Sequence, residues 1–205
     1  MTRRLSHAAP SAVLAAAAIW AAAPTAAATG LVGSRLAGSG ASVSAFGAAT
    51  LNNNWHQVFG QPHDLSWQDA GLAGVGAAVP LARWGGLELE VEGQLVRHFG
   101  AQNHWEVNAP ILTAAWTRWP WSQRLPSYAA FGIGPSFAST TPKLEARNNR
   151  ESSPTLIYWK IELGADLPAE GWSAFWRLHH RSTGYGLMGD AGGANAIGLG
   201  LRRRF

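Results

Sequence analysis

The sequence contains no cysteine among its 205 residues. Disulfide bonds, thiolate metal sites and a cysteine nucleophile are therefore excluded. Charged residues are also scarce, at 14% of the chain. The apolar run from Ala12 to Ala23 is shorter than the roughly 20 residues that a membrane-spanning helix needs. The chain must therefore be held together by packing or by closure of a sheet into a barrel.

The N-terminal segment has the pattern of a secretory signal peptide. Arg3 and Arg4 precede the apolar run, a proline follows it, and the alanines at 26–28 supply small residues for cleavage. A membrane anchor is the alternative, but the run is short for one. We predict that residues 1–28 are a signal peptide and that residues 29–205 form a single outer-membrane domain of 177 residues.

The composition of the predicted mature chain indicates a membrane surface rather than a nucleic-acid partner. Removing the two N-terminal arginines leaves 14 Lys and Arg against 12 Asp and Glu, so the excess of positive charge is small. Eleven tryptophans and 24 glycines are typical of a lipid-facing wall with aromatic girdles and tight turns. On composition alone, a soluble aromatic-rich sandwich remains the alternative.

Strict alternation of apolar and polar residues favours the barrel. Leu87, Leu89, Val91 and Leu95 share one face of an extended chain, and residues 88, 90, 92 and 94 on the other face are three glutamates and a glutamine. Glutamates in a row are costly in an apolar core but suit a polar lumen that also contains cations. The same alternation recurs at 157–163, where Tyr, Lys and Glu lie between apolar residues.

These patterns predict an all-β fold, an eight-stranded antiparallel transmembrane β-barrel. Pro80, Pro110 and Pro135 fall inside predicted strands and are expected to mark bulges or strand ends. The chain ends on Phe205, and a terminal aromatic residue on an amphipathic last strand is typical of outer-membrane barrels. The predicted strands are 41–51, 71–83, 86–98, 104–119, 127–139, 154–167, 171–183 and 194–205. Their lengths suit tilted membrane-spanning strands.

The seventh and eighth strands contain residues for nucleophilic catalysis. His180 and Ser182 share the lipid-facing side of strand 171–183, where the imidazole is placed to accept the seryl proton. Asn195 begins the same side of the next strand, where its carboxamide can orient the ring. The alternative is that these polar groups only meet water at the membrane interface. Gly184 and Gly192 are candidates to donate backbone N–H groups to an oxyanion.

These residues resemble a known family. The segment His180-Arg181-Ser182-Thr183-Gly184, a glycine-rich loop, Asn195 and the final Gly-Leu-Arg-Arg-Arg-Phe are similar to the C-terminal signature of the lipid A 3-O-deacylase (acyloxyacyl hydrolase) family. The resemblance implies an eight-stranded outer-membrane barrel that removes the 3-position acyl chain of lipid A without a metal. It implies Ser182 as nucleophile and His180 as base.

Two residues depart from the family pattern. Thr183 stands where the family commonly has asparagine, and Asn195 stands at about the position of the family's acidic residue, a glutamate. Either Asn195 or Asp190 of the loop therefore completes the triad. An outer-membrane barrel acyltransferase and a non-catalytic structural or adhesive barrel remain alternative functions. The expected partner is lipopolysaccharide, and no nucleic-acid partner or cofactor is expected. The spacing of His56, His63, His98 and His104 predicts no metal site.

Overall fold

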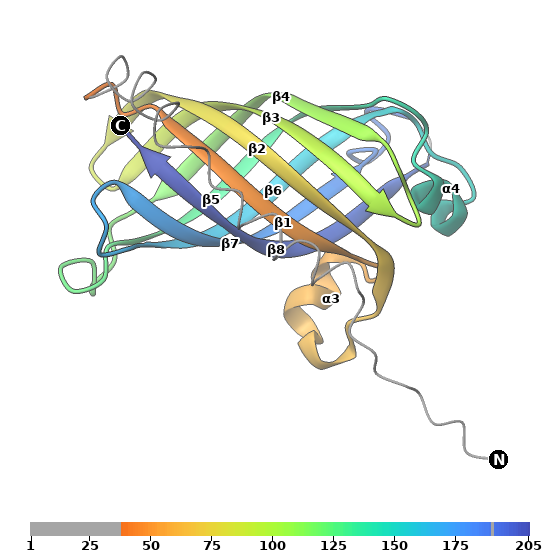
Figure 1. Ribbon diagram of the computed structural model, residues 1–205, viewed down its shortest axis with the longest axis horizontal. Helices are drawn as coiled ribbons and strands as arrows, with labels where there is room; N and C mark the ends of the chain where they lie inside the picture. The colour runs from red at the N-terminus through yellow and green to blue at the C-terminus, as the bar shows by residue number, and fades with distance from the viewer. Residues whose placement is uncertain (1–37, 190) are drawn as a thin grey trace.

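The computed structural model describes residues 38–189 and 191–205, which form a closed antiparallel barrel with the strands in chain order (Figure 1). The predicted signal peptide, residues 1–28, lies outside the described residues. The strands are β1 (Ser42–Leu51), β2 (Trp67–Trp84), β3 (Leu87–Gly100), β4 (Trp105–Trp116), β5 (Ser127–Ala138), β6 (Thr155–Asp166), β7 (Trp172–Ser182) and β8 (Gly193–Arg204). The described helices are α3 (Trp55–Gly60), η2 (Pro62–Asp64) and α4 (Lys143–Asn149).

The predicted fold class is confirmed. Each strand pairs with its sequence neighbour, and β1 pairs with β8 from Ser42 opposite Arg204 to Leu51 opposite Asn195. The predicted strand boundaries differ from the observed ones by a few residues, most clearly at β2, which begins at Trp67 rather than at residue 71. Because the barrel is closed, no edge of the described strands is left unpaired. In lipid every backbone N–H and C=O must be paired within the protein, so closure is required there.

The two ends of the barrel differ. The connections 85–86, 117–126 and 167–171 lie at the end where β8 finishes, which we call the turn end. The opposite end, which we call the loop end, has the β1–β2, β3–β4, β5–β6 and β7–β8 connections. Figure 1 shows α3 and α4 at the loop end, away from the C-terminus. Outer-membrane barrels place short turns in the periplasm and longer loops outside.

The outer wall is apolar, as the alternation predicts. Its exposed side chains include Val75, Leu81, Leu95, Leu112, Ile133, Leu163 and Leu199. Exposed tryptophans lie near both ends of the strands: Trp84, Trp116 and Trp172 at the turn end, and Trp67 and Trp105 at the loop end. Such belts are typical of membrane-spanning barrels. In the part of the chain that the structure describes, no helix is long and apolar enough to span a bilayer.

The lumen is filled by ion pairs. Glu162 accepts hydrogen bonds from Lys160 at 2.8 Å, from Arg177 Nε at 2.9 Å and from Arg202 at 2.9 Å. Lys160 also pairs with Glu92, and these five side chains are buried. The predicted inward direction of the β3 glutamates and of the polar β6 residues is therefore confirmed. Charges that would be costly in an apolar core satisfy one another across the barrel.

The three prolines inside strands lie at irregular pairings, as expected. The pairing of β2 with β3 shifts between Pro80 and Ala82, and that of β4 with β5 is interrupted between Asn108 and Leu112, which brackets Pro110. Pro135 lies on the β5 side of the same interruption, between Ile133 and Ser136, while its pairing with β6 is regular. A proline has no N–H for the ladder, so irregular pairing is the expected response.

Candidate active site

His180 and Asn195 form a directly opposed pair on the outer wall. His180 of β7 faces Asn195 of β8 in the strand register. The imidazole Nδ1 lies 2.6 Å from the carboxamide Oδ1. Both side chains are buried although they project from the outside of the barrel. The structure thus brings together two of the three residues that the sequence predicts for the site.

A second hydrogen bond fixes the direction of the Asn195 amide. Its Nδ2 donates to the backbone carbonyl of Asn53, at 2.8 Å. A carbonyl can only accept, so the amide nitrogen must face Asn53 and the amide oxygen must face His180. His180 therefore donates its Nδ1–H to Asn195. The neutral ring then has a free lone pair on Nε2, which is the tautomer that a general base requires.

Ser182 ends β7 two residues beyond His180 and projects from the same side of the strand. It is half-buried, pairs in register with Gly193, and its Oγ accepts the Gly184 N–H at 3.4 Å. Among the residues that the structure describes, no hydrogen bond joins Ser182 to His180. Catalytic hydrogen bonds are often long or poorly aligned without substrate, so the missing bond does not exclude two side chains that project from the same face of β7.

The β7–β8 connection places the two candidate oxyanion glycines differently. Gly184 lies against Ser182 and Ile157. Its φ of +60° is a backbone conformation that residues with a side chain rarely adopt. A Cβ at Gly184 would stand 2.2 Å from Ile157 Cδ1. Gly192, with φ of +123°, packs instead against Ser152 and Leu156. Gly184 is thus the candidate beside the serine, while Asp190 lies outside the described residues.

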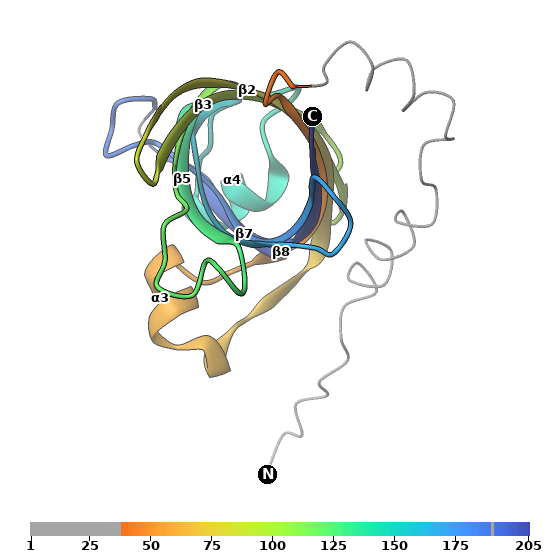
Figure 2. The same cartoon turned by 90° about the vertical axis from the view of Figure 1, so that its left-hand side faces the viewer.

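The β1–β2 connection covers this part of the wall from outside. Val58 of α3 packs with Leu51 and Leu178 in a small apolar cluster. Figure 2, viewed along the barrel, shows α3 outside the wall and α4 within the barrel outline. Trp55 of α3 contacts Trp159, with 5.7 Å between ring centroids, and the Trp159 ring lies against His180 at a tilt of 31°, with 4.2 Å between centroids. The helix explains why residues on the lipid-facing side are buried.

Sequence reasoning missed this covering helix. The segment 52–70 is polar enough to be interpreted as a plain loop, and α3 has only six residues. The signal that could have found it is the mixture of Trp55, Val58 and Phe59 at helical spacing. Trp55 and Phe59 contact Trp159 and Trp176 of the wall and remain 41% and 48% exposed. Exposed aromatic side chains beside the wall are suited to contact lipid.

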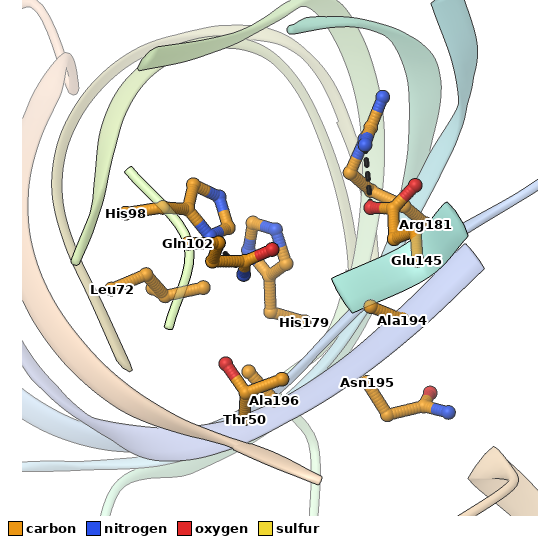
Figure 3. A pocket seen from close by; sticks show the side chains of 10 residues that line it. All are labelled: Thr50, Leu72, His98, Gln102, Glu145, His179, Arg181, Ala194, Asn195 and Ala196. Carbon is orange, nitrogen blue, oxygen red and sulfur yellow. Dashed lines mark hydrogen bonds and ion pairs between the residues drawn. The ribbon is translucent and has the colours of Figure 1, made fainter. Parts of the chain in front are cut away.

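The opposite side of β7 faces the lumen. Arg177, His179 and Arg181 are buried there, as the alternation predicts. His179 Nε2 lies 3.0 Å from Glu106 Oε1. At the loop end, Arg181 Nη1 donates a hydrogen bond to Glu145 Oε1 of α4, at 2.6 Å. Figure 3 shows Asn195 directed away from His179 and from this pair, so the sheet separates the candidate active site from the lumen.

Comparison with known proteins identifies the fold. No protein-family model matches the chain, and no curated protein matches it. Among solved structures, the outer membrane enzyme PagL aligns with a TM-score of 0.50 and 17% identity, over 80% of this chain and 99% of PagL. Neisserial surface protein A (NspA) aligns with a TM-score of 0.49 and 12% identity, over 82% of this chain and 98% of NspA. At this identity the likeness to PagL establishes one conclusion: the chain has the fold of a small outer-membrane β-barrel.

Proposed function

We propose that this protein is an outer-membrane esterase that removes the ester-linked 3-position acyl chain from lipid A of lipopolysaccharide. The observation that carries the proposal is the orientation of His180. Its Nδ1–H is held by Asn195, whose amide is fixed in turn by the Asn53 carbonyl. A buried imidazole with a free Nε2, beside a serine on a lipid-facing wall, is the arrangement of a base and its nucleophile.

The position of the site supports a lipid substrate. Ser182 and His180 lie at the loop end of β7 and project toward the bilayer rather than into the lumen. In an outer-membrane barrel the loop end lies at the outer leaflet, where lipopolysaccharide is found. Residues 180–184 and the chain end resemble the lipid A 3-O-deacylase family. This resemblance supports the ester at the 3-position of lipid A as the bond that is cleaved. The fold shared with PagL is compatible with this activity.

The reaction proceeds in two acyl transfers. Ser182 Oγ attacks the ester carbonyl while its proton passes to His180 Nε2. The tetrahedral intermediate collapses, the bond to the sugar 3-oxygen breaks, and His180 returns the proton to that oxygen. Water then attacks the acyl-serine with His180 again as base, which releases a fatty acid and restores the hydroxyl. The Gly184 N–H, which now donates to Ser182 Oγ, is a backbone donor beside the serine for the developing oxyanion.

Asn195 is the proposed third member of the triad. It holds His180 through a neutral hydrogen bond, where the related family has a carboxylate. An amide sets the tautomer and ring direction, but it stabilises the imidazolium less than a charged partner does. We therefore expect a slower enzyme than one with a glutamate at this position. Asp190 remains the alternative source of negative charge.

The test is the release of a 3-hydroxy fatty acid from purified lipopolysaccharide by the folded protein in detergent. We expect Ser182→Ala and His180→Ala each to abolish release. Their double variant should be no worse than either, because both changes disable the same step. Gln123→Ala, at an exposed position in the β4–β5 connection at the turn end, should retain activity.

Folding of each variant is checked by heat-modifiable migration on a gel. Full activity in folded Ser182→Ala would exclude this serine as the nucleophile. Absence of activity in every folded wild-type preparation would favour a structural barrel. Transfer of the acyl chain to another lipid, without free fatty acid, would instead identify an acyltransferase.

A further inference from the structure

Three lumen strands bring metal-binding side chains to one point near the loop end. His98 comes from β3, Glu106 from β4 and His179 from β7, and all three side chains are buried. His98 Nε2 lies 2.9 Å from Glu106 Oε2, and His179 Nε2 lies 3.0 Å from Glu106 Oε1. The three donor atoms all lie within 4.8 Å of one another. Two imidazoles and a carboxylate are a ligand set that zinc commonly uses.

Carboxylates outnumber cations in the ion pairs around this cluster. Two buried carboxylates, Glu106 and Glu145, lie there against one buried guanidinium, Arg181. Arg181 lies 3.6 Å from Glu106 but donates at 2.6 Å to Glu145, its closer partner. Nearer the turn end, Glu88, Glu90, Glu92 and Glu162 pair with Lys160, Arg177, Arg202 and Arg204, and the exposed Arg83 also pairs with Glu88. The carboxylates there do not outnumber the cations, in contrast to the histidine cluster.

Unpartnered polar atoms surround the same point. Gln102 Nε2 lies 3.0 Å from His98 Nδ1, while the buried Oε1 of Gln102 has no hydrogen-bond partner among the described residues. The nitrogen and oxygen of an amide are exchanged by a simple flip. After the flip, His98 Nδ1–H donates to Gln102 Oε1, and the Nε2 lone pair becomes free for a metal. An outer hydrogen bond of this kind is the usual partner of a metal-bound imidazole.

We propose that the barrel lumen holds one divalent transition-metal ion, with Zn²⁺ as the best fit, on His98 Nε2, His179 Nε2 and the Glu106 carboxylate. Tetrahedral ligands at about 2.0–2.1 Å from zinc stand roughly 3.3 Å apart. The separations of 2.9 and 3.0 Å, which run to the two different oxygens of Glu106, would lengthen slightly around the ion. The remaining pair of ligand atoms, which lies within 4.8 Å, would move closer together. Imidazole ligands favour zinc-like ions over calcium or magnesium.

Space for a fourth ligand lies beside the cluster. A cavity of about 10 Å³ is bounded by His98, Gln102 and His179, which point toward one another in Figure 3. That volume is close to the lower limit for one ordered water. The ion ties β3, β4 and β7 together across the lumen, beneath α4. It lies on the opposite side of the sheet from His180, so this site does not depend on the proposed esterase activity.

No sequence motif could reveal this site. His98 and Glu106 are eight residues apart, and His179 follows Glu106 by 73 residues. The spacing rules for zinc sites describe ligands on one local element. Here each ligand comes from a different strand, and only the closed barrel places the three together.

The test uses folded full-length protein in detergent, stripped with EDTA and then titrated with ZnCl₂. We expect one equivalent of Zn²⁺ per chain by elemental analysis after gel filtration, and a rise in the thermal unfolding midpoint. His98→Ala, Glu106→Gln and His179→Ala should each weaken binding at least tenfold. Co²⁺ in place of Zn²⁺ should give the intense visible absorption of a low-coordinate site.

His104→Phe is the matched control. His104 is also buried in the lumen, and its ring stacks on His98 with 4.1 Å between centroids. His104 is not one of the three ligands, and we expect His104→Phe to keep one Zn²⁺. The proposal is overturned if folded wild-type protein binds no Zn²⁺ equivalent. It is also overturned if binding survives in folded Glu106→Gln and His179→Ala, or if His104→Phe abolishes it.

Discussion

Replacing Asn195 by aspartate tests how the proposed base is controlled. The substitution keeps an oxygen facing His180 Nδ1, at the present 2.6 Å, but adds a negative charge. It also replaces the amide nitrogen that donates to the Asn53 carbonyl at 2.8 Å with a second oxygen. The first effect acts on the reaction, because His180 becomes an imidazolium during catalysis. The second acts on stability, because two acceptors then face each other.

The magnitudes follow from the kinds of bond involved. A neutral hydrogen bond contributes about 0.5–1.5 kcal/mol, and one to a charged group about 1.5–3 kcal/mol. A gain of about 1.4 kcal/mol in imidazolium stabilisation raises a rate tenfold. We therefore expect Asn195→Asp to raise kcat about tenfold and to lower the free energy of unfolding by about 1–3 kcal/mol. Asn195→Ala loses both bonds, so kcat and stability should both fall.

The assay measures fatty acid release at saturating lipopolysaccharide, beside urea unfolding of the same variants. Gln123→Ala, at an exposed position of the β4–β5 connection, serves as the unchanged reference. Equal kcat values for Asn195→Asp and Asn195→Ala would refute the reasoning, because the charge would then have no effect on the base. Unchanged stability of Asn195→Asp would show that the Asn53 contact does not hold the amide.

Two further predictions concern the lumen and the covering helix. Arg177→Ala removes a buried cation that donates to Glu162 inside the barrel. We expect it to lower the free energy of unfolding by about 3–5 kcal/mol. Arg83→Ala, whose side chain is 65% exposed, should cost less than about 1 kcal/mol, and equal urea midpoints for the two variants would contradict the buried network. Phe59→Ser removes an exposed aromatic group of α3 beside Trp176 and should raise KM for lipopolysaccharide severalfold with kcat unchanged. An unchanged KM would show that α3 does not contact the substrate.

Local sequence determined much of this protein. The two-residue period places Glu90, Lys160 and Arg177 inside the barrel and Leu95 and Leu163 outside, because successive side chains of a strand point to opposite faces. The same rule places His180 and Ser182 together on the outer side. The seventh and eighth strands are antiparallel neighbours joined by one connection, and this arrangement predicts that Asn195 lies near His180. These conclusions need only the strand period and the order of the strands.

Only the tertiary structure decided which distant groups meet. The Asn53 carbonyl that fixes Asn195 is 142 residues away in the chain. The short helices α3 and α4 occupy segments that the sequence predicted as polar loops, one outside the wall and one at the lumen. A strand period is a local property, whereas the contacts of a loop depend on the register at which the barrel closes. That register, set by all eight strand pairs together, also gathers His98, Glu106 and His179 at one point.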